Sequence, residues 1–264
     1  MWIQKMDHFL KDFGRGDHGS KSYQKFFFSV CALLAYKDLN TVDEYFRKVG
    51  FGSVNLIGED GVQCYIVYND KAILIIFCSL KGTKSNIIDP LIKGNSPLIG
   101  AKKLDKVWIS VRTCIDSNSD KDIYIAGHGL GGAMATIAAS RIQEQANFKQ
   151  GFTYGSPRVG DRKFVNSCDF RHIRVQNNND AVSKIPSALL GYKHMCEPTY
   201  MNYYGNIRKL TCWQTTKDRW RSLKIIQMVD DTSDHDMDKY CTKLHKLWQK
   251  ENRKTSKWHM NLQS

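Results

Sequence analysis

The chain has 264 residues, 42% of them hydrophobic and 25% charged, which is typical of a soluble globular protein with a substantial core. It contains no run of eighteen apolar residues, and its start lacks a secretory signal pattern. We therefore expect a cytoplasmic protein without a membrane-spanning helix. The net charge of +13 suits an anionic partner, either a membrane surface or a nucleic acid.

The first predicted elements are two helices and a β-hairpin. The continuous apolar run at 22–36 predicts a buried helix, and a polar helix follows at 41–49, where Gly50 stops it. Short β-like runs at 62–67 and 72–79 are separated by the turn Tyr-Asn-Asp, which predicts a hairpin.

Helices and strands alternate in the rest of the chain. The apolar spacing at 100–116 predicts an amphipathic helix. A strand, an alanine-rich helix and two more strands are expected at 122–126, 132–146, 151–155 and 171–176. This alternation predicts an α/β protein with a mainly parallel sheet covered by helices on both faces.

We expect a single domain over 1–264, because the chain has only five prolines and no internal repeat. Its core lies at about 20–248, with loose termini. The C-terminal stretch 245–260 is strongly basic, and two interpretations of it remain open. It forms a solvated helix and tail, or it attaches to an anionic membrane with Trp248 and Trp258 at the interface. Nucleic acid is not expected, because no nucleic-acid motif accompanies the charge.

The eight cysteines are spread along the chain without a C-x-x-C pair. This spacing predicts buried thiols in a reducing compartment, with no metal site and no cofactor. The sequence indicates no oligomeric state.

The segment IYIAGHGLGGAMAT at 123–136 predicts a sharp strand–turn–helix, the elbow that presents a nucleophile in G-x-S-x-G hydrolases. Gly127 and Gly131 allow the strand and helix to approach closely, but Gly129 stands where such a motif has serine. His128 precedes the tip and is expected to point elsewhere. A phosphate loop is excluded because no Gly-Lys-Ser/Thr follows, and a dinucleotide site lacks the acidic residue about twenty residues on.

The segment GHGLGGAMA resembles the GHSLGGALA segment of class 3 lipases, the fungal-type family of the α/β-hydrolase fold. TYGSPRVGD at 153–161, IRVQNNNDAVSKIPS at 173–187, GYKH at 191–194 and SDHDMDKYCTKL at 233–244 resemble further segments of this family. The N-terminal CALLAYKDL fits as well. The resemblance covers about residues 25–245 and implies an α/β-hydrolase fold with a short lid.

By this resemblance the family's catalytic aspartate and histidine fall on Asp180 and His235. Ester hydrolysis needs a histidine base oriented by a carboxylate, and the order elbow, Asp, His is the order of this fold. Two simpler interpretations remain open. Asp180 follows three asparagines and suits a turn, and His235 lies in an acidic stretch typical of a solvated surface.

Lys81-Gly82-Thr83 resembles the Arg-Gly-Thr/Ser turn that supplies the family's oxyanion hole. Thr83 and the N–H of Leu130 would be its donors, although Thr83 also suits a simple turn. The family's lid falls on 84–98, where Ile87, Ile88, Leu91 and Ile92 suit an apolar cover.

Glycine at position 129 cannot form an acyl-enzyme, so efficient hydrolysis by the family mechanism is not expected. The first interpretation is a lipase-like fold that binds a lipid, an ester or a protein partner. The second is a lipid-ester hydrolase in which His235 and Asp180 activate water. The third is a basic scaffold at a membrane surface.

Overall fold

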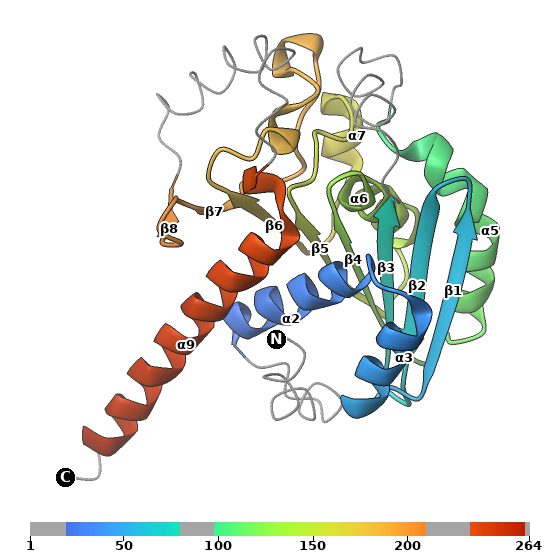
Figure 1. Ribbon diagram of the computed structural model, residues 1–264. Coiled ribbons are helices and arrows are strands. Elements are labelled where there is room, and N and C mark those ends of the chain that lie inside the picture. The colour runs from blue at the N-terminus through green and yellow to red at the C-terminus, as the bar shows by residue number, and fades with distance from the viewer. Residues whose placement is uncertain (1–19, 80–97, 210–232, 262–264) are drawn as a thin grey trace.

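The structure, a computed structural model, describes residues 20–79, 98–209 and 233–261 (Figure 1). Its α-helices are α2 (Lys21–Leu34), α3 (Leu39–Lys48), α5 (Ala101–Asp116), α6 (Leu130–Ile142), α7 (Arg162–Ser167) and α9 (Met237–Asn261). Short 3-10 helices are η2 (Val182–Lys184), η3 (Ala188–Leu190) and η4 (Ser233–His235). No helix among these residues has the length and hydropathy that a membrane span requires.

Eight strands form one sheet whose spatial order follows the chain. The strands are β1 (Ser53–Glu59), β2 (Val62–Tyr68), β3 (Ala72–Ser79), β4 (Asp122–His128), β5 (Phe148–Tyr154), β6 (His172–Asn177), β7 (Thr199–Met201) and β8 (Ile207–Arg208). The pairs from β3 to β7 are parallel, whereas β1–β2, β2–β3 and β7–β8 are antiparallel. The predicted hairpin, which is β2–β3, and the mainly parallel sheet are both confirmed.

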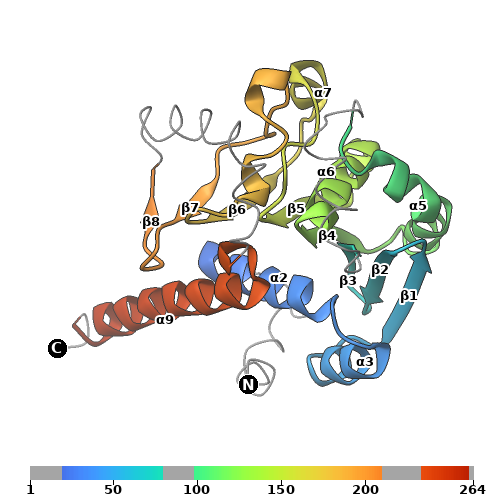
Figure 2. The same ribbon diagram turned by 45° about the horizontal axis from the view of Figure 1, so that its top comes forward.

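Two apolar cores lie on opposite faces of the sheet, as Figure 2 shows for the helices that cover them. Successive strand residues point to opposite faces, and β3 is buried on both sides. Leu74 and Ile76 pack with α2, α3 and α9, whereas Ile73, Ile75 and Phe77 pack with α5 and α6. Burial on both faces explains why β3 is continuously apolar.

Some elements differ from the sequence prediction. Strand β1 was not predicted, because it is a half-exposed edge strand without alternating apolar residues. The short elements α7, β7 and β8 were missed as well. Helix α6 begins at Leu130 instead of residue 132, and it ends at Ile142 instead of residue 146. Its two early glycines have low helix propensity, but tertiary contacts at the turn fix the helix start.

Helix α9 continues to Asn261, past residue 250, where we expected a loose terminus. Its first turns pack on α2, and Tyr240, Cys241 and Leu244 are fully buried there. The Trp248 ring is only 6% exposed and stacks on Phe26 with centroids 5.8 Å apart. Trp248 is therefore a core residue and does not supply the interfacial side chain that the membrane interpretation assigned to it. The side chain of Trp258 lies outside the described part of the chain.

Candidate active site

The turn between β4 and α6 consists of Gly129 alone. Its φ of +56° and ψ of −126° are torsions that a residue with a Cβ adopts only with strain. Gly127 and Gly131, before and after it, have to be glycine for a different reason, which is close packing. A Cβ on Gly127 would overlap the carbonyl of Gly131, and a Cβ on Gly131 would overlap the backbone of Phe77 in β3. The close strand–helix approach expected from the glycine pattern is therefore present.

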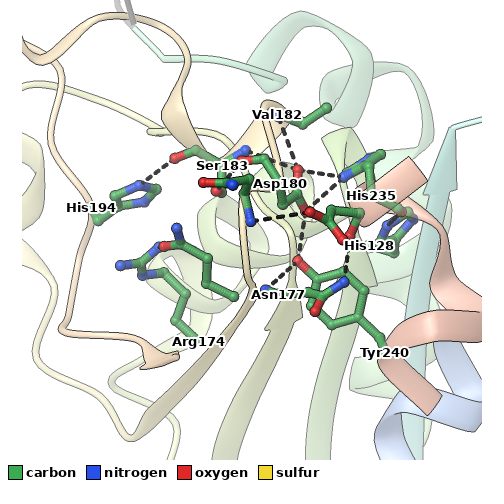
Figure 3. Close-up of polar contacts among 12 residues, drawn as sticks. His128, Arg174, Asn177, Asp180, Val182, Ser183, His194, His235 and Tyr240 are labelled. Carbon is green, nitrogen blue, oxygen red and sulfur yellow. Dashed lines mark hydrogen bonds and ion pairs between the residues drawn. The ribbon is translucent and has the colours of Figure 1, made fainter. Parts of the chain in front are cut away.

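Asp180 and His235 lie together beside this turn, although 55 residues separate them in sequence (Figure 3). His235 Nδ1 lies 3.0 Å from Asp180 Oδ1 and 2.9 Å from Oδ2. The carboxylate is completely buried, whereas the His235 side chain is 19% exposed. The Asp180 carboxylate can only accept hydrogen bonds, so His235 Nδ1 carries the proton. His235 Nε2 is then the ring nitrogen that remains available.

The His235 ring lies directly against the turn. A Cβ built on Gly129 would lie 2.8 Å from His235 Nε2 and 3.3 Å from Cε1. Real Cβ atoms do not approach a nitrogen so closely. The imidazole therefore occupies space that a side chain at position 129 would need. Gly155, at the end of β5, also has to be glycine, because its Cβ would overlap Asp180 Oδ2.

Tyr240 also contacts the buried Asp180 carboxylate. The sequence did not predict this contact. The Tyr240 hydroxyl donates to Asp180 Oδ2 over 2.6 Å and accepts the backbone N–H of Asn177 over 3.0 Å. Burial and the neighbouring Asp180 raise the pKa of Tyr240 well above its ordinary value, so it remains a donor. A signal was available, because the family-like segment SDHDMDKYCTKL at 233–244 contains this tyrosine, five residues after His235.

The three asparagines before Asp180 hold η4, the short helix that carries His235. Asn177 Nδ2 donates to the carbonyl of Asp234 over 2.8 Å, and Asn178 Nδ2 donates to its carboxylate over 2.9 Å. The N–H of Asn179 reaches the same carboxylate over 3.2 Å. The asparagine run therefore connects the end of β6 to the segment before α9. Sequence analysis treated it only as a turn.

Two buried histidines support the same region. His128 Nε2 donates to the backbone carbonyl of His235 over 2.8 Å, and its Nδ1 accepts from the Tyr36 hydroxyl over 2.8 Å. The rings of His128 and His235 stack with centroids 4.2 Å apart, so the expectation that His128 points elsewhere is wrong. His194, in the GYKH segment, donates to the carbonyl of Ser183 over 2.8 Å and holds the turn after Asp180. Burial lowers the pKa of both His128 and His194 well below the ordinary value.

Only part of the predicted oxyanion hole can be placed. Leu130 is the first residue of α6, and its N–H therefore has no acceptor within the helix. Lys81, Gly82 and Thr83 lie outside the described residues, as does the predicted lid up to residue 97. Seven cysteines in the described segments carry free thiols, and four of them are buried. No cluster of His, Cys, Asp or Glu in those segments could hold a metal ion.

Comparison with known proteins identifies the family. Residues 91–190 match the family described as Lipase (class 3). Over this segment the chain is similar to the class 3 lipase family. It is 38% identical over 81 residues to secreted mono- and diacylglycerol lipase 1 of Fusarium solani, a match covering 30% of this chain and 24% of that protein. It is 37% identical over 87 residues to phospholipase A1-Igamma2, chloroplastic, of Arabidopsis thaliana. This match covers 28% of this chain and 16% of that protein. The matched segments thus span less than a third of these relatives.

Solved structures confirm the α/β-hydrolase fold of the chain. The mono- and diacylglycerol lipase from Aspergillus oryzae superposes with a TM-score of 0.57 at 19% identity, covering 73% of this chain and 84% of that one. The lipase from Rhizopus microsporus var. chinensis superposes with a TM-score of 0.54 at 19% identity. This superposition covers 69% of this chain and 75% of that one. At this identity the likeness concerns the fold alone.

Proposed function

We propose that this class 3 lipase family member has the acid–histidine pair of an ester hydrolase beside an elbow without a nucleophile, and that it binds an acyl lipid instead of hydrolysing it efficiently. Asp180 and His235 are the pair, and Gly129 takes the nucleophile position. The observation that carries the proposal is the contact between the His235 ring and Gly129. The ring occupies the space of a nucleophile side chain, and its Nε2 faces the turn from which a nucleophile would act.

The missing side chain has a large chemical cost. In a serine hydrolase, loss of the nucleophile lowers kcat by roughly a million-fold, because no acyl-enzyme forms. The remaining groups still suit binding. The N-terminus of α6, including the N–H of Leu130, offers backbone donors to a carboxylate or an ester carbonyl. By the family resemblance Thr83 would be the second donor, and a fatty acid or an acyl ester is the ligand class that the α6 N-terminus suits.

A second candidate is slow hydrolysis by water. His235 supports it, because its ring is partly exposed, its Nδ1 is engaged by a buried carboxylate, and Nε2 remains available as a general base. This route lacks a covalent step, so it needs one water held in position by His235 alone. It would show as a slow ester hydrolysis that disappears in His235→Ala.

The deciding experiment compares the unmodified chain, Gly129→Ser and Gly129→Ala on short- and long-chain esters. We expect background rates for the unmodified chain and for Gly129→Ala, and a gain of at least about a hundred-fold for Gly129→Ser. The gain should vanish when His235→Ala is added to Gly129→Ser. A gain that survives His235→Ala would contradict the assigned pair. Turnover by the unmodified chain that depends on His235 would replace the proposal with the water mechanism.

Binding is measured separately by calorimetric titration with decanoate. We expect the unmodified chain to bind it and Gly129→Leu to bind at least about ten-fold more weakly, because the leucine side chain fills the space before α6. Gly52→Leu is the matched control, because nothing in the structure lies close to its Cβ position. If the unmodified chain takes up no decanoate, the acyl-binding part of the proposal is lost.

A further inference from the structure

Helix α9 has a basic face opposite to its buried face. Five basic residues recur at spacings of four, three, four and three residues, which places them along one stripe of an α-helix. We call this set the basic stripe: Lys239, Lys243, Lys246, Lys250 and Arg253. Tyr240, Leu244 and Trp248 pack into the core from the other side of the helix. The stripe therefore lies opposite the core-facing side of α9, although the Lys243 ammonium reaches Asn177 Oδ1 over 2.6 Å.

The charges of the basic stripe reinforce one another. All of its residues except Lys243 are exposed. The acidic residues of the described part of α9, Asp238 and Glu251, lie off the stripe by helical position, and Glu251 accepts a hydrogen bond from Ser22 of α2. Burial lowers the pKa of Lys243, and Lys239 and Lys246 lower it further, whereas Asp234 acts in the opposite direction. This surface thus concentrates positive charge along the helix.

A hairpin with exposed aromatic residues lies directly beside the stripe. Strands β7 and β8 are joined by a turn that contacts Lys243, whose Nζ donates to the Asn202 carbonyl over 3.0 Å. Tyr203 is 71% exposed and Tyr204 is 81% exposed, and Ile207 is exposed as well. Figures 1 and 2 both show β8 next to α9. We call this element, with Tyr203, Tyr204 and Ile207, the tyrosine hairpin.

We propose that the basic stripe and the tyrosine hairpin together form a docking surface for a bilayer that contains anionic phospholipid. Lysine and arginine near a membrane are attracted by anionic headgroups, and tyrosine rings favour the interfacial region. The combination favours a bilayer over nucleic acid, because exposed Ile207 gains by entering the apolar boundary and offers no contact to a base or phosphate. The surface does not depend on hydrolysis or acyl binding.

The surface differs from the one expected from sequence. The membrane interpretation of the C-terminal stretch placed Trp248 at the interface, but Trp248 anchors α9 to α2 instead. The tyrosine hairpin supplies the interfacial side chains, and sequence analysis did not identify them. Because α9 begins two residues after His235, the basic stripe and His235 belong to one continuous segment.

Vesicle sedimentation tests the proposal with the unmodified chain. We expect binding to vesicles of phosphatidylcholine with about a third phosphatidylserine, weak binding to pure phosphatidylcholine, and release at about 1 M salt, where exposed charges are screened. The triple variant Lys239→Glu, Lys246→Glu and Lys250→Glu should bind at least about fifty-fold more weakly, since each lysine contributes about five-fold. The double variant Tyr203→Ser and Tyr204→Ser should reduce binding with net charge unchanged.

The matched control reverses three exposed lysines elsewhere: Lys71→Glu, Lys102→Glu and Lys163→Glu. It changes net charge equally and should keep most of the binding. Equal loss in both triple variants would overturn the proposal, because net charge alone would then explain attachment. It would also be overturned if vesicles do not bind while mixed-sequence RNA binds through the stripe. Circular dichroism checks that each variant is folded, and decanoate titration reports separately on the acyl site.

Discussion

Gly129 combines two properties that rarely meet in one residue. Its backbone has positive φ, and the space beside its Cα is filled by the His235 ring. Serine at this position would strain the backbone and would also require the imidazole to move away from the turn. The ring is held by Asp180 on one side and stacks on His128 on the other, so such a movement meets resistance.

We expect Gly129→Ser to lower the free energy of unfolding by about 1–3 kcal/mol, the cost of a strained backbone conformation. Gly129→Ala should lower it by a similar amount, because the Cβ and not the hydroxyl causes the conflict. Urea denaturation with fluorescence detection measures both. An alanine variant as stable as the unmodified chain would show that the His235 ring moves away freely.

A substitution of Tyr240 can separate two contributions to stability. One is the hydrogen bond of its hydroxyl to Asp180, and the other is the packing of its ring in the core beside α9. Tyr240→Phe keeps the ring but removes the donor to Asp180 and leaves the N–H of Asn177 without its acceptor. We expect the free energy of unfolding to fall by about 1–3 kcal/mol, since a buried polar group loses its partner. Tyr204→Phe is the control, because its hydroxyl is on the exposed hairpin, and it should change stability by less than about 0.5 kcal/mol. Equal small effects would contradict the role assigned to the Tyr240 hydroxyl.

At the scale of elements, α2 and α9 form one unit on the sheet, and Trp248 is its main aromatic contact. The Trp248 ring contacts both Tyr23 and Phe26, with centroids 6.0 Å and 5.8 Å away. We expect Trp248→Ala to lower the free energy of unfolding by about 3–5 kcal/mol, as for other buried aromatic residues. The control Lys250→Ala, two residues further along α9, should leave the free energy of unfolding nearly unchanged. If Trp248→Ala weakens vesicle binding without affecting thermal unfolding, Trp248 is an interfacial residue after all.

The sequence predicted the elements that are long or strongly patterned. The hairpin β2–β3, the amphipathic α5 and the strand–glycine–helix turn at Gly129 follow from local rules of spacing and sterics. The edge strand β1 and the short β7 and β8 have no such pattern, because few of their residues are buried. The distal turns of α9 were read as a tail since most of their residues are charged or polar, whereas the core contacts of the helix lie about ten residues earlier.

Residue pairing was predictable only in part. Asp180 and His235 were proposed from the resemblance, and the structure brings them within hydrogen-bonding distance. The roles of four further residues were not predicted, because their contacts join segments about sixty residues apart. These residues are Asn177, Asn178, Asn179 and Tyr240. Nothing in the local sequence shows that an asparagine run will hold a short helix elsewhere in the chain.

In the described part of the molecule, the three histidines His128, His172 and His194 share one electrostatic property. Burial lowers the pKa of His128 and His194 well below the ordinary value and lowers that of His172 to about 3. In the unfolded chain each histidine titrates near about 6.5. Below that pH the unfolded chain binds protons that the folded chain does not, so the stability from these groups is fully present above about pH 6.5 and is lost as the pH falls.

We therefore expect the free energy of unfolding to fall steeply from pH 6 to 5, relative to its value near pH 7. Each histidine contributes a slope of up to about 1.4 kcal/mol per pH unit. Urea denaturation at each pH measures this. His172→Gln should make the slope shallower by roughly 1 kcal/mol per pH unit, because it removes one titrating group while keeping a polar partner for the Thr153 hydroxyl, which lies 2.9 Å from His172 Nε2. The same slope in both proteins would mean that His172 is protonated equally in the folded and unfolded chains, against the effect of its burial.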